Sequence, residues 1–268
     1  MTVPRVTLTS LTPDTGADLL VVGPSLGTAV VPLWSACVAA LGSRFTVVGY
    51  DAPGHGASPA TDEPFTVAEL ATAVAEAVRP LTTARGTRAR YAGVSLGGAV
   101  GLELALAHAD VVSAVAVICS GAKIGERSGW LERAELVRSA GTPVMVEGSA
   151  TRWFAPGFIG REPTTATALL ASLQDADRFS YARACEALAA FDVGDRLGDL
   201  RVPVLAAVGA LDTVVPTFAA AQIEAAAPDG EAVVLDGAAH LGPAEVPVEM
   251  ARLLTDFFTR KVLTRDAS

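Results

Sequence analysis

The sequence predicts a doubly wound, mostly parallel α/β sheet with a helical insertion, and two observations carry this prediction. Short apolar runs that suit buried strands alternate along the chain with longer runs of helical periodicity. One long stretch, residues 121–190, interrupts this alternation and contains helical patterns only.

The predicted strands are short apolar runs bounded by turn residues. An edge hairpin comes first, because apolar and polar residues partly alternate over residues 3–9 and "TPDTGAD" then supplies a turn. The later runs are continuously apolar, as expected of strands that are buried on both faces. We expect these strands over residues 18–23, 45–51, 88–94, 111–120, 202–210 and 231–237.

Helical periodicity fills the segments between these strands and follows the last of them. We expect helices over residues 31–41, 67–81, 96–107, 218–227 and 246–260. Strands and helices that alternate in this way indicate parallel strands joined by right-handed crossovers.

The stretch 121–190 is too long for one crossover, which needs only about a dozen residues. It contains Trp130 and Trp153, two of the three tryptophans, and eight of the 20 lysines and arginines. We therefore expect residues 121–190 to form a helical cap over the strand ends. Residues 1–120 and 191–268 would form the α/β core domain.

The composition limits the classes of partner. Hydrophobic residues make up 51% of the 268 residues, which is enough for a large core. The net charge of −9 argues against binding to nucleic acid or to an anionic membrane surface. No apolar run approaches the roughly 18 residues of a membrane span. A small-molecule partner is expected, and a homo-oligomer stays open.

The cysteines and the first residues indicate a cytoplasmic protein. Cys37, Cys119 and Cys185 are odd in number and form no CxxC pair, so we expect free thiols in a reducing compartment. The N-terminal "MTVPRVTLTS" lacks the pattern of a signal peptide. We expect neither a metal nor a cofactor.

Ser95 is the candidate nucleophile, within "YAGVSLGGAV". It follows an apolar strand and precedes a helix, with Gly93 and Gly97 two residues away on either side. A nucleophile elbow needs this GxSxG spacing, because larger side chains would clash in so tight a turn. The alternatives are an ordinary strand-to-helix turn and a phosphate-binding loop, of which the second would have more glycines and a lysine.

A serine nucleophile needs a base and an orienting acid. His108 ends the helix that Ser95 begins, so it lies at the far end of the sheet. His55 lies in "DAPGHGAS" and suits a structural turn. His240 follows the last strand, on the same sheet edge as Ser95, and is the predicted base.

Asp212 follows the strand before that one and is the predicted acid, although a lone aspartate there could also cap the next helix. The order Ser95, Asp212, His240 is that of the α/β-hydrolase fold. In this fold the backbone N–H groups of Leu96 and of Leu26, in "VVGPSLGT", would form the oxyanion hole. Pro24-Ser25 replaces the His-Gly pair that is common in lipases.

The sequence resembles the 3-oxoadipate enol-lactonases over nearly its whole length. The motifs that carry the resemblance are "GPSLGT", "YDAPGHGAS", "GVSLGGAVGLELA", "AKIGERSGWLERAELVR", "TRWFAPGF", "GALDTVVP" and "GAAHLGPAEVP". The resemblance implies an enzyme of aromatic catabolism that opens an enol-lactone to 3-oxoadipate. The segment "HLGPAEVP" and the alanine-rich second half of the cap depart from the pattern of this family. The resemblance therefore defines the fold more closely than it defines the substrate.

Such a lactone carries a carboxylate, and the cap offers arginines to bind it. Arg133 lies three residues after Trp130, on one helical face, and Arg152 adjoins Trp153. An arginine can bind a carboxylate through two hydrogen bonds while a tryptophan covers the ring. These residues and Ser25 are the predicted substrate-binding residues. The alternative is that the arginines are solvated surface residues.

Two other functions stay open. The same scaffold serves carboxylesterases, acyl-homoserine lactonases, carbon–carbon bond hydrolases and cofactor-free perhydrolases. A ligand receptor on this fold could also retain a complete triad.

Overall fold

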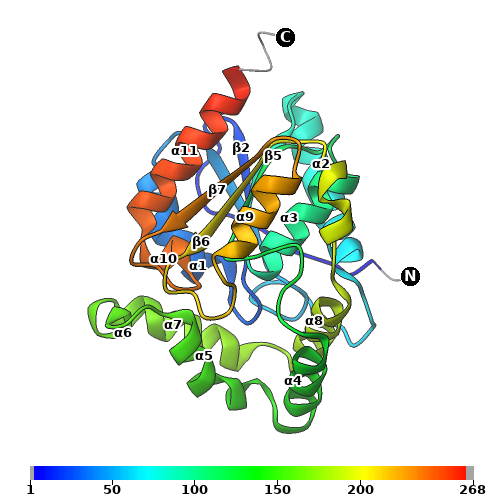
Figure 1. Cartoon of the computed structure of the whole chain (residues 1–268), viewed down its shortest axis with the longest axis vertical. Helices are drawn as coiled ribbons and strands as arrows, with labels where there is room; N and C mark the ends of the chain where they lie inside the picture. Colours follow the sequence, from blue (N-terminus) through cyan, green and yellow to red (C-terminus); the bar gives the residue numbers. More distant parts are fainter. Residues whose placement is uncertain (1–2, 264–268) are drawn as a thin grey trace.

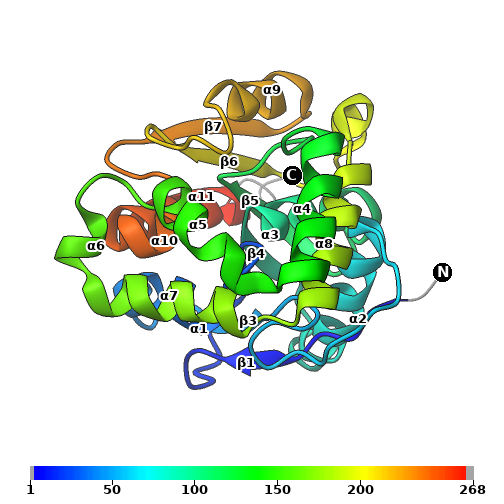
Figure 2. The ribbon, with the colours of Figure 1, turned by 90° about the horizontal axis from the view of Figure 1, so that it is seen from below.

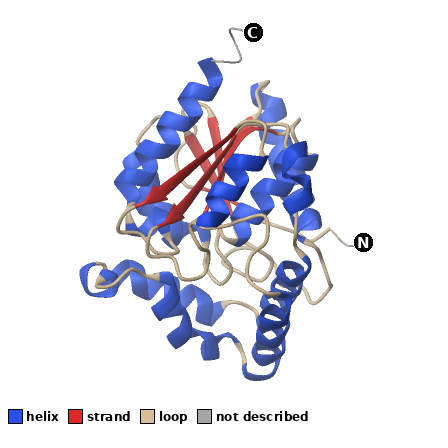
Figure 3. Cartoon of the chain, in the orientation of Figure 1, coloured by secondary structure: helices blue, strands red, loops and turns tan. Residues whose placement is uncertain are grey.

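The computed structural model describes residues 3–263. Within them lies a seven-stranded sheet with helices on both faces (Figures 1 and 3). The order across the sheet is β1-β3-β2-β4-β5-β6-β7, and every neighbouring pair except β1–β3 is parallel. The strands are β1 (Leu8–Ser10), β2 (Leu19–Gly23), β3 (Thr46–Tyr50), β4 (Ala89–Val94), β5 (Val112–Ile118), β6 (Val204–Gly209) and β7 (Gly230–Leu235).

Helices cover the sheet because its central strands are apolar on both sides. β2 is buried along its whole length, as are β3 and β6. Helix α1 packs against α11, and α2 packs against α3. The helices of the core domain are α1 (Val30–Leu41), α2 (Val67–Arg85), α3 (Leu96–Ala107), α9 (Phe218–Ala226), α10 (Gly242–Glu245) and α11 (Pro247–Leu263). The predicted doubly wound α/β sheet is confirmed.

The described helices between β5 and β6 form a separate layer across the carboxyl ends of the strands (Figures 1 and 2). We call them the cap helices: α4 (Arg127–Ala140), α5 (Val146–Trp153), α6 (Phe158–Arg161), α7 (Pro163–Asp175) and α8 (Arg178–Ala190). The 3₁₀ helix Thr142–Met145 lies among them, and Gly194–Asp199 leads back to β6. Helix α4 packs along α8, and α7 contacts α1 of the core.

The edge hairpin predicted for the N-terminus is wrong. Strand β1 lies at the edge of the sheet, but it pairs antiparallel with β3, Leu8 opposite Tyr50, and not with β2. The turn after β1 therefore carries the chain past β3 to the interior of the sheet.

No described helix is both long enough and apolar enough to cross a bilayer.

The strand order places loops from distant parts of the sequence together. After β2 the chain moves to one side, to β3, and it then returns across β2 to β4. The loops after β2 and β4 therefore diverge from a topological switch point, where open α/β sheets commonly bind ligands. The loops that follow β5, β6 and β7 continue this edge under the cap helices.

Candidate active site

Ser95 occupies a strained turn between β4 and α3. Its φ of 53° lies in the left-handed region, which side chains other than glycine rarely adopt. A side chain at Gly93 would overlap the backbone of Gly97, and a Cβ at Gly97 would lie 2.8 Å from the Pro24 oxygen. The turn therefore requires glycine at both flanking positions, as a nucleophile elbow does.

The backbone amides of Ser95 and Gly97 are both hydrogen-bonded, whereas the Leu96 amide between them has no acceptor among the described residues. The Ser95 N–H donates to the Ile118 oxygen at 2.9 Å, and the Gly97 N–H donates to the Pro24 oxygen at 3.0 Å. Leu96, between them, is the first residue of α3, and the first amides of a helix have no partner within the helix. Its N–H is therefore available to a ligand oxygen.

The loop between β2 and α1 holds a second such amide. The Ser25 N–H donates to Thr28 Oγ1 at 3.1 Å, and the Gly27 N–H donates to His55 Nε2 at 3.2 Å. Leu26 lies between these two residues, and its N–H has no protein partner within residues 3–263. The two amides proposed for the oxyanion hole are thus both without a hydrogen-bond acceptor among residues 3–263.

His240 and Asp212 form a buried pair behind the nucleophile. His240 Nδ1 lies 2.8 Å from Asp212 Oδ2, and the side chains are 2% and 0% exposed. Asp212 Oδ1 accepts hydrogen bonds from the Val214 and Val215 N–H groups, at 2.7 and 3.0 Å. These two bonds fix the carboxylate so that its other oxygen faces the imidazole.

The loop that carries His240 is fixed by a residue that the sequence analysis did not identify. The half-buried Glu245 carboxylate accepts hydrogen bonds from the N–H groups of Ala239 and Leu241, at 3.0 and 3.1 Å, and from that of Ala155 in the cap. Burial raises the pKa of Glu245. Glu245 thus fixes the backbone on both sides of the histidine.

The other two histidines have structural contacts. His108 ends α3 and its Nε2 lies 3.2 Å from Thr72 Oγ1, at the opposite end of that helix from Ser95. His55 is 1% exposed, its Nδ1 lies 2.9 Å from the Pro53 oxygen, and its ring stacks on Tyr181 of α8. Because His55 Nε2 accepts the Gly27 N–H, the ring is neutral with its proton on Nδ1.

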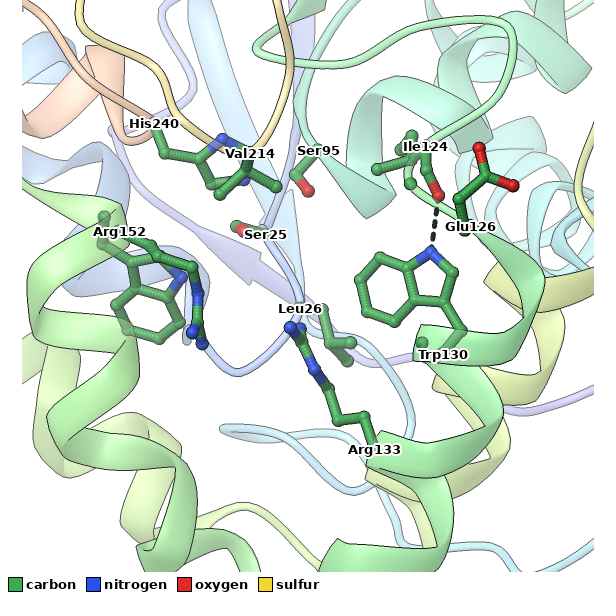
Figure 4. Close-up of a pocket in the computed structure, with 13 residues that line it drawn as sticks. Ser25, Leu26, Ser95, Ile124, Glu126, Trp130, Arg133, Arg152, Val214 and His240 are labelled. Atoms are coloured by element: carbon green, nitrogen blue, oxygen red, sulfur yellow. Dashed lines mark hydrogen bonds between the residues drawn. The ribbon is translucent and has the colours of Figure 1, made fainter.

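A cavity of about 230 Å³ connects these groups with the cap helices. Among the residues that line it are both reacting side chains, Ser95 and His240 (Figure 4). Within the described part of the chain, Ser95 Oγ makes no hydrogen bond to His240, and Figure 4 shows the hydroxyl directed into the cavity. Leu26 of the predicted oxyanion hole also lines it, as do the predicted substrate-binding residues Ser25, Trp130, Arg133, Arg152 and Trp153.

Arg133 and Arg152 extend into this cavity from two cap helices (Figure 4). The Arg133 guanidinium lies 4.6 Å from the centre of the Trp130 ring, so Trp130 supports the arginine with one face. Burial lowers the pKa of Arg152, and the nearby charge of Arg133 lowers it further. Neither arginine is paired with a carboxylate among the described residues. The cavity therefore presents two positive charges to a ligand.

Cys119 lies beside the buried pair, with its sulfur within 4.8 Å of ligand atoms of Asp212 and His240. The three residue types could in principle bind a transition metal. Here Nδ1 and the carboxylate already bond to each other, and burial raises the thiol pKa well above its ordinary value. The thiol instead donates a hydrogen bond to the Ala239 oxygen, which suits support of the His240 loop.

The fold and this site define the class of the protein. Residues 19–253 match the model of the alpha/beta hydrolase family, and the chain belongs to that family. The α/β-hydrolase fold predicted from the residue order is thereby confirmed.

Within the family the chain is similar to enol-lactonases, as its motifs suggest. It is 36% identical to 3-oxoadipate enol-lactonase 2 of Acinetobacter baylyi, over 73% of this chain and 72% of that protein. Identity to 3-oxoadipate enol-lactonase 1 of the same organism is 32%, over 90% of this chain and 88% of that one. The crystal structure of the enol-lactonase from Burkholderia xenovorans superposes with a TM-score of 0.87 at 30% identity, covering 95% of this chain and 96% of that chain.

Proposed function

We propose that the protein opens a small anionic enol-lactone, as 3-oxoadipate enol-lactone is, through a serine acyl-enzyme in the catabolism of aromatic compounds. The observation that carries this proposal is the pair of arginines, with no carboxylate partner among the described residues, that line the same cavity as Ser95 and His240. Two guanidinium groups beside a nucleophile favour a substrate that carries a carboxylate near its reacting carbonyl. The similarity to two 3-oxoadipate enol-lactonases supports the same substrate class.

The proposed reaction begins when Ser95 Oγ attacks the lactone carbonyl carbon and His240 Nε2 accepts its proton. The Leu26 and Leu96 amides stabilise the oxyanion, while Asp212 stabilises the imidazolium. The bond to the ring oxygen then breaks, and His240 returns the proton to the enol oxygen. The enol tautomerises to the ketone. Water activated by His240 finally hydrolyses the acyl-enzyme and frees the serine.

The buried free thiols at Cys37, Cys119 and Cys185 support a cytoplasmic location, because reducing compartments keep cysteines unpaired. We also propose that residues 121–190 act as the cap domain that selects the substrate, since both arginines come from it.

The test is turnover of enol-lactone, p-nitrophenyl acetate and an acyl-homoserine lactone by wild type and by Arg133→Met. Loss of a charge-assisted contact costs about 1.5–3 kcal/mol, or roughly 10- to 150-fold in kcat/KM for the anionic lactone. The neutral ester should be hardly affected. Arg127→Met is the matched control on α4, because Arg127 is exposed and bonds to the Ala189 oxygen. Equal losses on both substrates from Arg133→Met would mean that the arginine only supports the cap.

A fluorophosphonate probe tests whether the serine is activated, because only an activated serine is labelled, and a partner pull-down with and without ligand tests for a receptor. If the probe does not label the wild-type protein, the acyl-enzyme mechanism is wrong.

A further inference from the structure

A second, larger cavity lies beside the first. Its volume is about 720 Å³, and it lies between the segment that leads from β5 into the cap and helix α9. Its apolar wall comes mainly from α9 and the loops before it, and includes Phe218, whose side chain is 61% exposed.

The two cavities adjoin at shared residues. Gly125, Glu126 and Val214 line both of them. In Figure 4, Val214 lies by His240 and Ser95, while Glu126 lies on the other side of Ser95. A substrate whose reacting carbonyl lies at Ser95 could therefore extend past Val214 into the second cavity.

The chemistry of the second cavity differs from that of the first. Among residues 3–263, no arginine lines it and the one lysine that does, Lys123, is bonded to Glu126 at 3.1 Å. Asp192 Oδ1 accepts the N–H of Gly194 at 3.0 Å. These charged groups already have partners, and together they are acidic. An anionic arm would be repelled here, whereas an uncharged apolar arm could cover the exposed Phe218 ring.

We propose that the second cavity binds the uncharged arm of an ester or lactone substrate larger than an unsubstituted enol-lactone. The carboxylate of such a substrate lies at the arginines, its carbonyl at Ser95, and its apolar arm against α9. This inference rests on the proposed function for the position of the carboxylate. The substrate class is therefore a monoanion with an apolar group on the other side of its reacting bond.

The experiment measures kcat/KM for the methyl, butyl and hexyl monoesters of succinate, with methyl, butyl and hexyl acetate in parallel. Each fully buried methylene is worth about fourfold. Because the cavity is partly open, we expect a rise of roughly tenfold from methyl to hexyl succinate. Gln222→Trp, at an exposed position of α9 that lines the cavity, should remove this rise and leave methyl succinate unchanged. Ala221→Trp, exposed on the same helix but outside the lining, is the matched control.

The outcomes separate this inference from the proposed function. A rise with chain length that Gln222→Trp removes and Ala221→Trp preserves supports the second cavity as a binding site. A flat or falling series in both ester sets, or the same result with both tryptophan variants, overturns it. If the acetates show the rise but succinates are hydrolysed no faster than acetates, the second cavity stands and the anionic substrate of the proposed function fails.

Discussion

Replacing His55 by phenylalanine tests whether the loop between β2 and α1 supplies an oxyanion donor. Phenylalanine keeps a ring to stack on Tyr181, whose centre lies 6.0 Å from that of His55. It removes the acceptor of the Gly27 N–H and the donor to the Pro53 oxygen. Each buried backbone group left unpaired costs about 1–3 kcal/mol, so the free energy of unfolding should fall by about 2–6 kcal/mol.

The effect on turnover follows from the position of Gly27, directly after Leu26. Loss of a whole oxyanion donor lowers kcat by roughly 100- to 1000-fold. A displaced Leu26 amide should cost less, about 10- to 100-fold in kcat, with KM little changed. The assays are p-nitrophenyl acetate hydrolysis and denaturant unfolding. His55→Gln keeps one acceptor and one donor, so it should lose less kcat and less unfolding free energy than His55→Phe. Wild-type kcat in folded His55→Phe would refute the role of this loop.

The same variant should change the pH dependence of stability. Burial lowers the pKa of His55, so the folded protein keeps the ring neutral at a pH where the unfolded chain protonates it. The unfolded state then binds more protons, and stability falls as the pH drops below about 6.5, by up to about 1.4 kcal/mol per pH unit, until the folded-state pKa is reached. His55→Phe should show a smaller difference in unfolding free energy between pH 7.5 and pH 5.5. Burial also lowers the pKa of His108, so His108 supplies part of the pH dependence of stability that remains in the variant.

Three further predictions concern residues around the nucleophile. Ser95→Ala should lose phosphonate labelling and lower kcat by several orders of magnitude while the protein stays folded, and persistent turnover would contradict its role. His240→Gln should lose turnover, whereas His108→Gln should keep nearly wild-type kcat; a folded but inactive His108→Gln would show that the base is misassigned. Glu245→Gln keeps only one acceptor oxygen for the three N–H groups, so we expect about 1–3 kcal/mol less stability and a lower kcat. Urea unfolding measures the stability in parallel. Unchanged kcat in Glu245→Gln would mean that the His240 loop keeps its conformation without the Glu245 carboxylate.

The sequence predicts those features that depend on local patterns and on strand order. Burial on both faces makes the core strands continuously apolar, and the GxSxG spacing follows from the clash at Gly93 and Gly97. Helix α3 spans Leu96–Ala107, as its periodicity predicts. The partner of β1 could not be predicted in this way, because pairing with β3 depends on a contact 40 residues away that leaves no local pattern.

The supporting contacts of the site were missed for a related reason. The Glu245 carboxylate accepts hydrogen bonds from amides in two segments, one of them in the cap. A single glutamate in "GPAEVP" does not indicate this role, because the two segments meet only in the folded protein. His55 was expected to be a turn residue, and its bond to Gly27 joins two loops whose closeness only the folded sheet determines. Trp130 was expected to cover the substrate ring, yet Arg133 occupies one of its faces.

The bonds between the cap and the His240 loop bear on how new specificities could be engineered in this scaffold. The His240 N–H donates to the Trp153 oxygen at 3.1 Å, and the Ala155 N–H donates to Glu245. A chimaera that exchanges α4 to α8 for those of a relative would therefore also replace two anchors of the proposed base. Grafts that keep residues 153–155 with the recipient should retain a positioned imidazole, whereas whole-cap grafts should need compensating changes in the loop itself.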